Sequence, residues 1–504
     1  MSKKFSKFPP KKPDNSHIIK HNPKREWSDY QKDIFRDIAK ATDHTVVIAR
    51  AGSGKTSTIV EGFKYIPRGK KTLMVAFNKS IADELKQRAP SYVDTLTLHS
   101  LGFRAIKQAF GNVVLEQDKS RMIVASIIGE DYDLWELNQS ICKCVSLCKG
   151  FLFDTPKGVD DLIDRFGIEI FDLSRDVFID HVLKTLAKSK AQKLVIDFDD
   201  MIWFPFVYRL NVGKFDVVFV DEAQDLNAAQ MAMVMSAVKP DGRIIAVGDP
   251  AQSIYQFRGA DSEAMPNFIN KLKAKTLPLS VTYRCPKKVV KLAQEIVPDI
   301  EAHKDSPDGE VIELDVAFLL KTVKPGDFIL SRTNAPLIKH CMALLKAGVP
   351  ANIQGRDVGA NLIYFIKKSK AKTINKFIEY VNNWKDQEVK RLLSEKKNIE
   401  VCEDKAECLL NLCEGTLTIK DLKETIEKLF NDVADDNKVI LSTTHKAKGL
   451  ERDRVFILVG TYRKSGAGGE EDNLWYVAVT RAKKELYLVS KPSKYTQYDD
   501  KKVV

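Results

Sequence analysis

VVIARAGSGKTSTIV, residues 46–60, is the stretch that decides the fold. A β-branched run suited to a buried strand leads through a glycine-rich turn into KTSTIVEGFKYI, which has the pattern of a helix. A strand, a glycine-rich turn and a helix N-terminus direct several backbone N–H groups and the positive end of the helix dipole at one point. The stretch therefore predicts a phosphate-binding loop.

The loop matches the pattern G-x-x-x-x-G-K-[ST] except at Ala49, where the pattern has its first glycine. We expect Lys55 to reach the β and γ phosphates of ATP and Thr56 to hold Mg²⁺. Because Ala49 ends the strand, a small residue suffices there if its φ is negative. The alternative interpretation is a turn with an incidental lysine. The expected nucleotide-binding residues of the loop are Ala51, Gly52, Ser53, Gly54, Lys55, Thr56 and Ser57.

Composition narrows the class of protein. At 504 residues the chain is too long for one hydrophobic core, and roughly three or four domains are expected. With 44% hydrophobic and 29% charged residues, no apolar run of membrane-spanning length and no signal peptide, we expect a soluble protein without a membrane segment. The net charge of +12 suits a polyanionic partner such as nucleic acid. Eight cysteines without a disulfide-like spacing indicate a reducing compartment, cytoplasmic, nucleoid or nuclear according to the host.

Short apolar runs alternate with helical patterns, which predicts an α/β fold of parallel sheets covered by helices. One set of runs precedes residue 275, and a second set begins with TLPLSVTYR, residues 276–284. Strand signals fade in two regions, which we interpret as helical insertions. The expected divisions are a flexible basic arm at 1–25, a first α/β domain at 26–105 and 191–275 with an insertion at 106–190, a second α/β domain at 276–360 and 436–495 with a compact insertion at 361–435, and a tail at 496–504.

Two acidic strand ends follow the phosphate loop. In FDVVFVDEAQDLN, residues 215–227, a buried strand ends in Asp221 and Glu222, at the edge where open α/β sheets bind ligands. Asp221 suits Mg²⁺, and Glu222 can orient and deprotonate the attacking water, although such a pair can also cap a helix. In AVGDPAQSIYQFRGA, residues 246–260, Gln252 is placed to contact the γ-phosphate, and Phe257 offers either a stacking face for a base or a core side chain.

Further stretches occur in a recognisable order around these two. They are Gln31 in EWSDYQKDIF, then ARAGSGKT, VAFNKS, TLTLHSLGF, VDEAQD, GDPAQSIYQFRGA, TYRCP, LSTTHKAKGLE and YVAVTRAKKELYLV. In this order the chain resembles the superfamily 1 DNA helicases of the UvrD/Rep/PcrA type over about residues 27–490. AFNKSIADEL and HKAKGLE are especially similar to the helicase part of the F-box DNA helicases.

The resemblance implies two RecA-like domains with ATP and Mg²⁺ in the cleft between them. Gln31 would contact the adenine edge, Tyr283 would stack on the base, and Glu451 would contact the ribose. Arg284 and Arg481 would reach across from the second domain. Their charges would close the site only when ATP bridges the domains, which links hydrolysis to domain opening.

The resemblance also implies a groove for single-stranded DNA across both domains, and 3′ to 5′ movement. The residues it assigns to this groove are Phe77, Asn78, Thr97, His99, Phe257, Thr444 and His445. It makes the protein a DNA-stimulated ATP hydrolase, a helicase or translocase acting on single strands and on junctions with duplex. We expect a monomer, with replication or recombination proteins as partners.

One connection departs from the resemblance. Relatives of this type can carry a duplex-separating β-hairpin where this chain has only TYRKSGAGGEE, residues 461–471. Translocation is therefore better supported than efficient strand separation, and an ATP-switched clamp or remodeller of protein–DNA complexes is the alternative. A P-loop kinase is disfavoured by the second α/β domain and its two arginines. RNA stays open as the track, since stacking and phosphate contacts work on either polymer.

Overall fold

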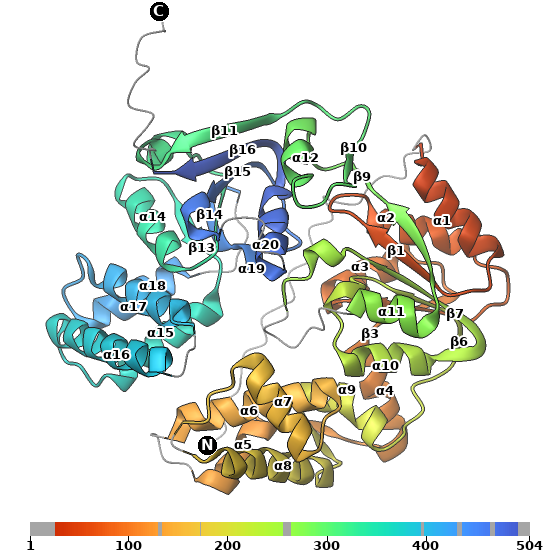
Figure 1. Cartoon of the computed structure of the whole chain (residues 1–504), viewed down its shortest axis with the longest axis horizontal. Coiled ribbons are helices and arrows are strands. Elements are labelled where there is room, and N and C mark those ends of the chain that lie inside the picture. The colour runs from red at the N-terminus through yellow and green to blue at the C-terminus, as the bar shows by residue number, and fades with distance from the viewer. Residues whose placement is uncertain are drawn as a thin grey trace, which may run out of the picture.

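The computed structural model describes residues 26–129, 134–171, 173–255, 264–394, 398–430, 436–463 and 469–491. Its two largest elements are six-stranded parallel sheets, drawn at the right and at the upper left of Figure 1. The first has the strand order β3-β2-β6-β7-β1-β8. Its strands are β1 (Thr45–Ala49), β2 (Thr72–Ala76), β3 (Val93–Thr97), β6 (Phe215–Val220), β7 (Val238–Gly248) and β8 (Lys275–Leu279).

Helices cover both faces of the first sheet. Successive side chains of its strands point to opposite faces, and the side chains on both faces are buried. On β1, Val47 packs with helices α1, α2 and α3, and Val46 packs on the opposite face with α4, α10 and α11. The strands are apolar on both faces, as buried parallel strands are. These helices are α1 (Asp29–Lys40), α2 (Lys55–Gly62), α3 (Lys79–Arg88), α4 (Leu98–Phe110), α10 (Ala228–Ala237) and α11 (Ala264–Leu272).

The second sheet has the order β11-β16-β15-β12-β14-β13 and is also parallel. Helices α12 and α20 pack with one face, and α14 packs with the other. Its strands are β11 (Glu310–Asp315), β12 (Phe328–Ser331), β13 (Ala351–Ile353), β14 (Val439–Thr443), β15 (Arg452–Leu458) and β16 (Ala482–Ser490). Its helices are α12 (Lys287–Ala293), α13 (Leu319–Thr322), α14 (Ala335–Lys346), α19 (Thr444–Ala447) and α20 (Glu470–Val479). The predicted fold class, two RecA-like parallel-sheet units with mainly helical insertions, is confirmed.

One strand assignment from the sequence is wrong. The run that begins at residue 276 was placed in the second sheet, but β8 pairs with β1 and forms the edge of the first sheet. The apolar run alone carries no information about which sheet it joins. Pro278 lies within β8, and an edge strand tolerates proline because one side of it makes no ladder hydrogen bonds. The boundary drawn between residues 275 and 276 therefore falls inside a strand.

The first insertion is a helical unit, seen at the bottom of Figure 1, that lies between the short paired strands β4 (Val114–Leu115) and β5 (Val195–Ile196). Buried ion pairs join it to the following helix: Lys119 lies 2.6 Å from Asp200, and Lys149 lies 3.0 Å from Asp197. Its helices are α5 (Lys119–Ile128), α6 (Trp135–Phe151), α7 (Pro156–Phe166) and α8 (Arg175–Ala191), followed by α9 (Phe198–Val207).

The second insertion is held by apolar packing that is continuous with the second sheet. It comprises α15 (Arg356–Lys368), α16 (Ile374–Ser394), α17 (Glu400–Cys413) and α18 (Ile419–Leu429), at the left of Figure 1. Within the described ranges, no helix combines the length and the apolar character needed to cross a bilayer.

The two insertions touch each other. The rings of Trp135 and Tyr364 stack with centroids 4.1 Å apart. Two ion pairs flank the stack, Glu136 with Lys368 at 2.6 Å and Glu169 with Arg391 at 2.5 Å. We refer to these three pairs as the insertion bridge. It connects the two insertions, and through them the two halves of the chain.

Candidate nucleotide and nucleic-acid sites

The phosphate loop joins β1 to α2 and lies at the contact between the two halves of the chain. Gly52 and Gly54 have φ values of 71° and 80°, in the left-handed region that glycine adopts without strain. A Cβ on Gly52 would also lie 2.6 Å from the Cβ of Arg284, so only glycine fits there. Ala49 ends β1, fully buried and without a positive φ. The glycine missing from the pattern therefore stands where the backbone does not require one.

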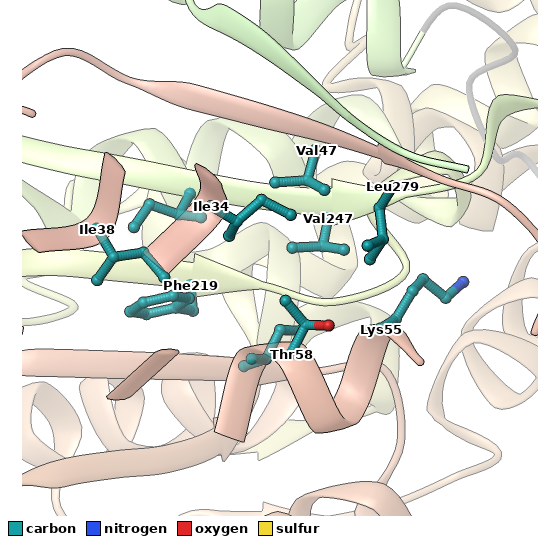
Figure 2. A pocket seen from close by; sticks show the side chains of 10 residues that line it. Ile34, Ile38, Val47, Lys55, Thr58, Phe219, Val247 and Leu279 are labelled. Carbon is teal, nitrogen blue, oxygen red and sulfur yellow. The ribbon is translucent and has the colours of Figure 1, made fainter. Parts of the chain in front are cut away.

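A small apolar cavity of about 10 Å³ lies beneath the first turns of α2. Figure 2 shows that the stem of Lys55 borders this cavity, whereas its amino nitrogen points away from it. A space of this size with apolar walls is a packing gap, since a water molecule would find no polar partners there. Its walls are formed by Ile34, Ile38, Val47, Thr58, Ile59, Phe219, Ile245, Val247 and Leu279.

The amino group of Lys55 instead reaches the acidic pair after β6. Its Nζ donates to Glu222 Oε2 at 2.8 Å, and Gln224 Nε2 donates to the same oxygen at 2.6 Å. Glu222 has a φ of 50°, an uncommon backbone conformation for a residue with a side chain. Asp221 is buried whereas Glu222 is partly exposed, and the Lys55 ammonium is paired with Glu222, so this one cation does not compensate both carboxylates equally.

Burial and the neighbouring Glu222 charge raise the pKa of Asp221 to about 7. Burial also acts to raise the pKa of Glu222, but the Lys55 and Lys448 charges outweigh it and lower that pKa to about 2. Asp221 and Thr56 offer one carboxylate and one hydroxyl oxygen. This set suits Mg²⁺, which keeps several water or phosphate ligands of its own. The described residues contain no group of three or more His, Cys, Asp or Glu side chains that could enclose a metal ion.

Asp249, at the end of β7, holds Gln252. Gln252 Nε2 donates to Asp249 Oδ2 at 2.8 Å, and Arg50 Nη1 donates to Asp249 Oδ1 at 3.0 Å. The backbone N–H of Asp249 donates to Gln224 Oε1 at 3.1 Å. Gln252 is therefore connected to Glu222 by a continuous chain of hydrogen bonds.

The two residues expected at the adenine lie together although they come from distant parts of the chain. Tyr283 Oη donates to Gln31 Oε1 at 3.4 Å, and Gln31 Nε2 donates to Thr58 Oγ1 at 2.9 Å. Gln31 is buried, whereas the Tyr283 side chain is 37% exposed and is available for stacking. His303 packs against the Tyr283 ring with centroids 4.8 Å apart. The sequence did not single out His303, because an isolated histidine in a loop carries no motif.

The two arginines expected across the cleft differ in their partners. Arg284 forms an ion pair with Glu451. The Glu451 carboxylate, which we expect to contact the ribose, is therefore paired with the Arg284 guanidinium in this structure. Arg481 is 1% exposed and donates to uncharged oxygens, Val477 O at 2.8 Å and Leu450 O at 3.2 Å among them. Burial and the neighbouring Arg284 charge lower the pKa of Arg481 to about 9. No carboxylate within the described ranges accepts a hydrogen bond from it.

The residues expected at nucleic acid on the first sheet follow β2 and β3. Phe77 is 44% exposed. Asn78 Oδ1 and Thr97 Oγ1 accept the N–H groups of Ile81 and Ser100, so both side chains cap helices. His99 lies beside a polar cavity of about 110 Å³, and burial lowers its pKa, which keeps it neutral at pH 7. Other residues that line this cavity include Lys149, Asp199, Asn227 and Gln230.

On the second sheet, a cleft of about 710 Å³ opens beyond the ends of β12 and β14. His445 lines it, and buried Thr444 is hydrogen-bonded to Tyr462 Oη. Arg332 and Asn334, which follow β12, also line it. The sequence interpretation missed this pair, although SRTNAP, residues 331–336, places polar side chains directly after an apolar strand. Phe257 falls outside the described residues.

Comparisons with known proteins give matches in both halves. The family model of the UvrD/REP helicase N-terminal domain matches residues 30–273, and that of the UvrD-like helicase C-terminal domain matches residues 367–493. The chain is 26% identical to F-box DNA helicase protein 1 of Schizosaccharomyces pombe, an alignment that covers 88% of this chain and 55% of the relative. It is 26% identical to ATP-dependent DNA helicase PcrA of Bacillus subtilis, over 69% of this chain and 53% of the relative. The chain thus spans about half the length of these curated relatives.

Proposed function

The chain belongs to the UvrD-like helicase family, and on that premise we propose that it is an ATP-dependent DNA helicase or translocase. The observation that carries the proposal is the arrangement of the cleft. A phosphate loop and an acidic pair belong to the first sheet, and Gly52 of the loop lies close against Arg284, whose neighbour Arg481 is a buried cation of the other half of the chain. The names of the relatives, which are DNA helicases, support DNA as the polymer.

ATP would bind with its phosphates on the loop amides and Lys55. Bound Mg²⁺, held by Asp221 and Thr56, would neutralise phosphate charge. The phosphates compete with Glu222 for Lys55, whose ammonium now lies 2.8 Å from that carboxylate. Withdrawal of the lysine frees Glu222 to accept a proton from the attacking water.

The far end of the nucleotide and the second half of the chain complete the site. Gln31 and Tyr283 would hold the adenine, and Glu451 the ribose once it releases Arg284. Gln252 would contact the γ-phosphate. Arg481, a buried cation without a carboxylate partner in the described ranges, would stabilise the charge that develops during transfer.

Single-stranded DNA would cross both sheets. We assign to its path Phe77, Asn78, Thr97, His99, Phe257, Thr444 and His445, joined by Arg332 and Asn334 from the cleft of the second sheet. Movement from 3′ to 5′, action as a monomer at single-strand and junction sites, and work beside replication or recombination proteins are part of the proposal. The proposal also includes the domain limits expected from the sequence, except that β8 is assigned to the first unit. The protein would be located where the DNA is, which is the cytoplasm and nucleoid or a nucleus, according to the host.

A second candidate function is an ATP-switched DNA clamp or a remodeller of protein–DNA complexes. The observation that favours it is the connection after η8 (Val459–Thr461), where α20 begins at Glu470. Eight residues, 462–469, separate these two elements in the sequence, a short span for a long duplex-separating hairpin; residues 464–468 lie outside the described ranges. A strand-displacement assay on tailed duplexes separates the two candidates, because robust ATP-dependent opening eliminates the clamp.

The test of the main proposal is ATP hydrolysis measured with single-stranded DNA, with single-stranded RNA and without polymer. We expect stimulation by DNA in the wild type and none in Lys55→Ala, with unchanged circular dichroism. Stimulation by RNA alone would reassign the track. A Lys55→Ala variant with wild-type turnover would show that the site is misplaced.

A further inference from the structure

One helix of the second sheet, α20, makes direct contacts with the phosphate loop. The Oη of Tyr476 accepts the backbone N–H of Ala51 at 3.0 Å and donates to Asp249 Oδ2 at 3.2 Å. Asn473, on the same helix, donates to the backbone oxygen of Ser253 at 2.9 Å. A single hydroxyl from the second half of the chain therefore joins two segments of the nucleotide site in the first half.

All three partners of this bridge are buried. Tyr476 and Asp249 have no exposed area, and Ala51 is 1% exposed. A buried amide or carboxylate that loses its partner cannot find water in its place, so such bonds hold their groups in one arrangement. The bridge therefore defines the position of the loop relative to Asp249 only while the second sheet is docked.

Asp249 transmits this contact to groups that the proposed reaction uses. The oxygen that accepts the Tyr476 hydroxyl also accepts Gln252 Nε2 at 2.8 Å. Through its backbone N–H, Asp249 holds Gln224, whose amide donates to Glu222 at 2.6 Å. The second sheet is thus connected by hydrogen bonds to the residue at the γ-phosphate and to the expected general base.

Tyr476 is also rigidly connected to Arg481. The Thr480 hydroxyl donates to the backbone oxygen of Tyr476 at 2.8 Å, and the Thr480 hydroxyl accepts a hydrogen bond from Arg481 Nη2 at 3.1 Å. Six residues of chain, 476–481, therefore carry both the bridge and the buried guanidinium. When the second sheet moves away from the loop, both must leave together.

We propose that Tyr476 is a positioning residue that makes ATP turnover depend on docking of the second sheet. Its hydroxyl aligns the phosphate loop with Asp249, and through Asp249 with Gln252 and Glu222. This inference rests on the proposed function, since it concerns the regulation of the same nucleotide site. It assigns to α20 a part in the site beyond delivering Arg481.

The test is Tyr476→Phe, which keeps the ring and removes only the hydroxyl. We expect kcat with single-stranded DNA to fall about tenfold while KM for ATP stays close to wild type; the melting temperature should fall by a few degrees, because Ala51 and Asp249 lose a buried partner. The matched control is Tyr487→Phe, also in the second half, whose hydroxyl is hydrogen-bonded to Glu485 and Arg454 of its own half. A purely structural role of the Tyr476 hydroxyl would lower the melting temperature without separating kcat from KM.

A double variant checks the route through Asp249. If the hydroxyl acts through that carboxylate, Tyr476→Phe combined with Asp249→Asn should lose no more turnover than the worse single variant. Losses that multiply would overturn the inference.

Failure of the inference and failure of the proposed function give different results in these measurements. A wild type that hydrolyses ATP on DNA, with a Tyr476→Phe variant of equal kcat, overturns the inference alone. A wild type without hydrolysis overturns the proposed function. The inference is then judged by small-angle scattering without DNA, where a non-hydrolysable ATP analogue should compact the wild type and not Tyr476→Phe. Equal responses of the two proteins would overturn it.

Discussion

The two sides of the nucleotide cleft differ in how their charges are satisfied. On the first-sheet side, Glu222 and Asp249 have cationic partners from their own half of the chain: Lys55 binds Glu222, and Arg50 binds Asp249. On the other side, the hydrogen bonds that Arg481 donates to described residues all go to uncharged oxygens, although its side chain is buried. Burial of a cation costs free energy unless an anion compensates it. The charges of Glu222 and Asp249 are thus compensated within the first half, whereas the second half keeps a charge that suits an anion supplied from outside.

Removal of that charge should have the largest effect. We expect Arg481→Ala to lower kcat for DNA-stimulated hydrolysis by about 10⁴-fold, the range seen when an arginine that stabilises phosphoryl transfer is lost. Affinity for ATP should change much less. Steady-state kinetics and a fluorescent-nucleotide titration measure the two effects. Arg481→Lys is the control, since it keeps the charge without the planar fork. A kcat within threefold of wild type would remove Arg481 from the mechanism.

On the first side, Glu222→Gln keeps the shape of the side chain and removes its basicity. We expect turnover to fall about 10³-fold while ATP still binds, so that unhydrolysed ATP accumulates on the protein. Single-turnover quench experiments check this. Glu451→Gln, on the opposite side, is the comparison variant and should raise KM more than it lowers kcat. Wild-type hydrolysis by Glu222→Gln would mean that another group activates the water.

The ion pair of Lys448 with Asp225, at 2.6 Å, joins the two sides and is sensitive to pH. Burial raises the pKa of Asp225 to about 6, with Lys448 opposing the shift. Because this pKa exceeds the unfolded value, the group contributes most to stability below about pH 4, and its contribution falls as the pH rises through 6. The change is of the order of 3 kcal/mol.

Melting temperatures of wild type and Asp225→Asn between pH 4 and 7 check this. The variant should lose less stability than wild type as the pH rises over this interval. Parallel curves for the two proteins would show that Asp225 keeps an ordinary pKa in the folded state.

The smallest effect is expected at Ala49. Because its φ is not positive, Ala49→Gly should leave turnover within about twofold and lower the free energy of unfolding by about 0.5–1 kcal/mol. ATPase assays and denaturant unfolding measure the two. A large gain in activity would show that the loop is compromised by alanine.

Local spacing explains what could be predicted from the sequence. The phosphate loop, the acidic pair and the two-sheet fold depend on residues a few positions apart, because strand ends and helix starts are encoded locally. The sheet to which β8 belongs was predicted wrongly, since pairing with β1 depends on residues more than two hundred positions earlier. Tyr476 lies within YVAVTRAKKELYLV, but the local pattern of that stretch indicates no role for its hydroxyl. Its contacts with Ala51 and Asp249 are set by the docking of two separate cores.

The candidate DNA contacts show a different limit. Asn78 and Thr97 fit a helix cap as well as a nucleic-acid contact, and in the structure each caps a helix. The residue type cannot distinguish these uses, because the same oxygen serves both. Arg332 and Asn334 were missed because their cleft is formed partly by α17 of the second insertion.

The insertion bridge also affects how the chain is made. Trp135 leaves the ribosome 229 residues before its stacking partner Tyr364 (364 − 135 = 229). At typical rates of synthesis this delay is on the order of 10 to 50 seconds. During that time the first insertion can pack its own helices, but the outer face of its Trp135 ring stays in water. Until Tyr364 emerges, Trp135 therefore lacks the aromatic partner that stacks on it in the finished protein.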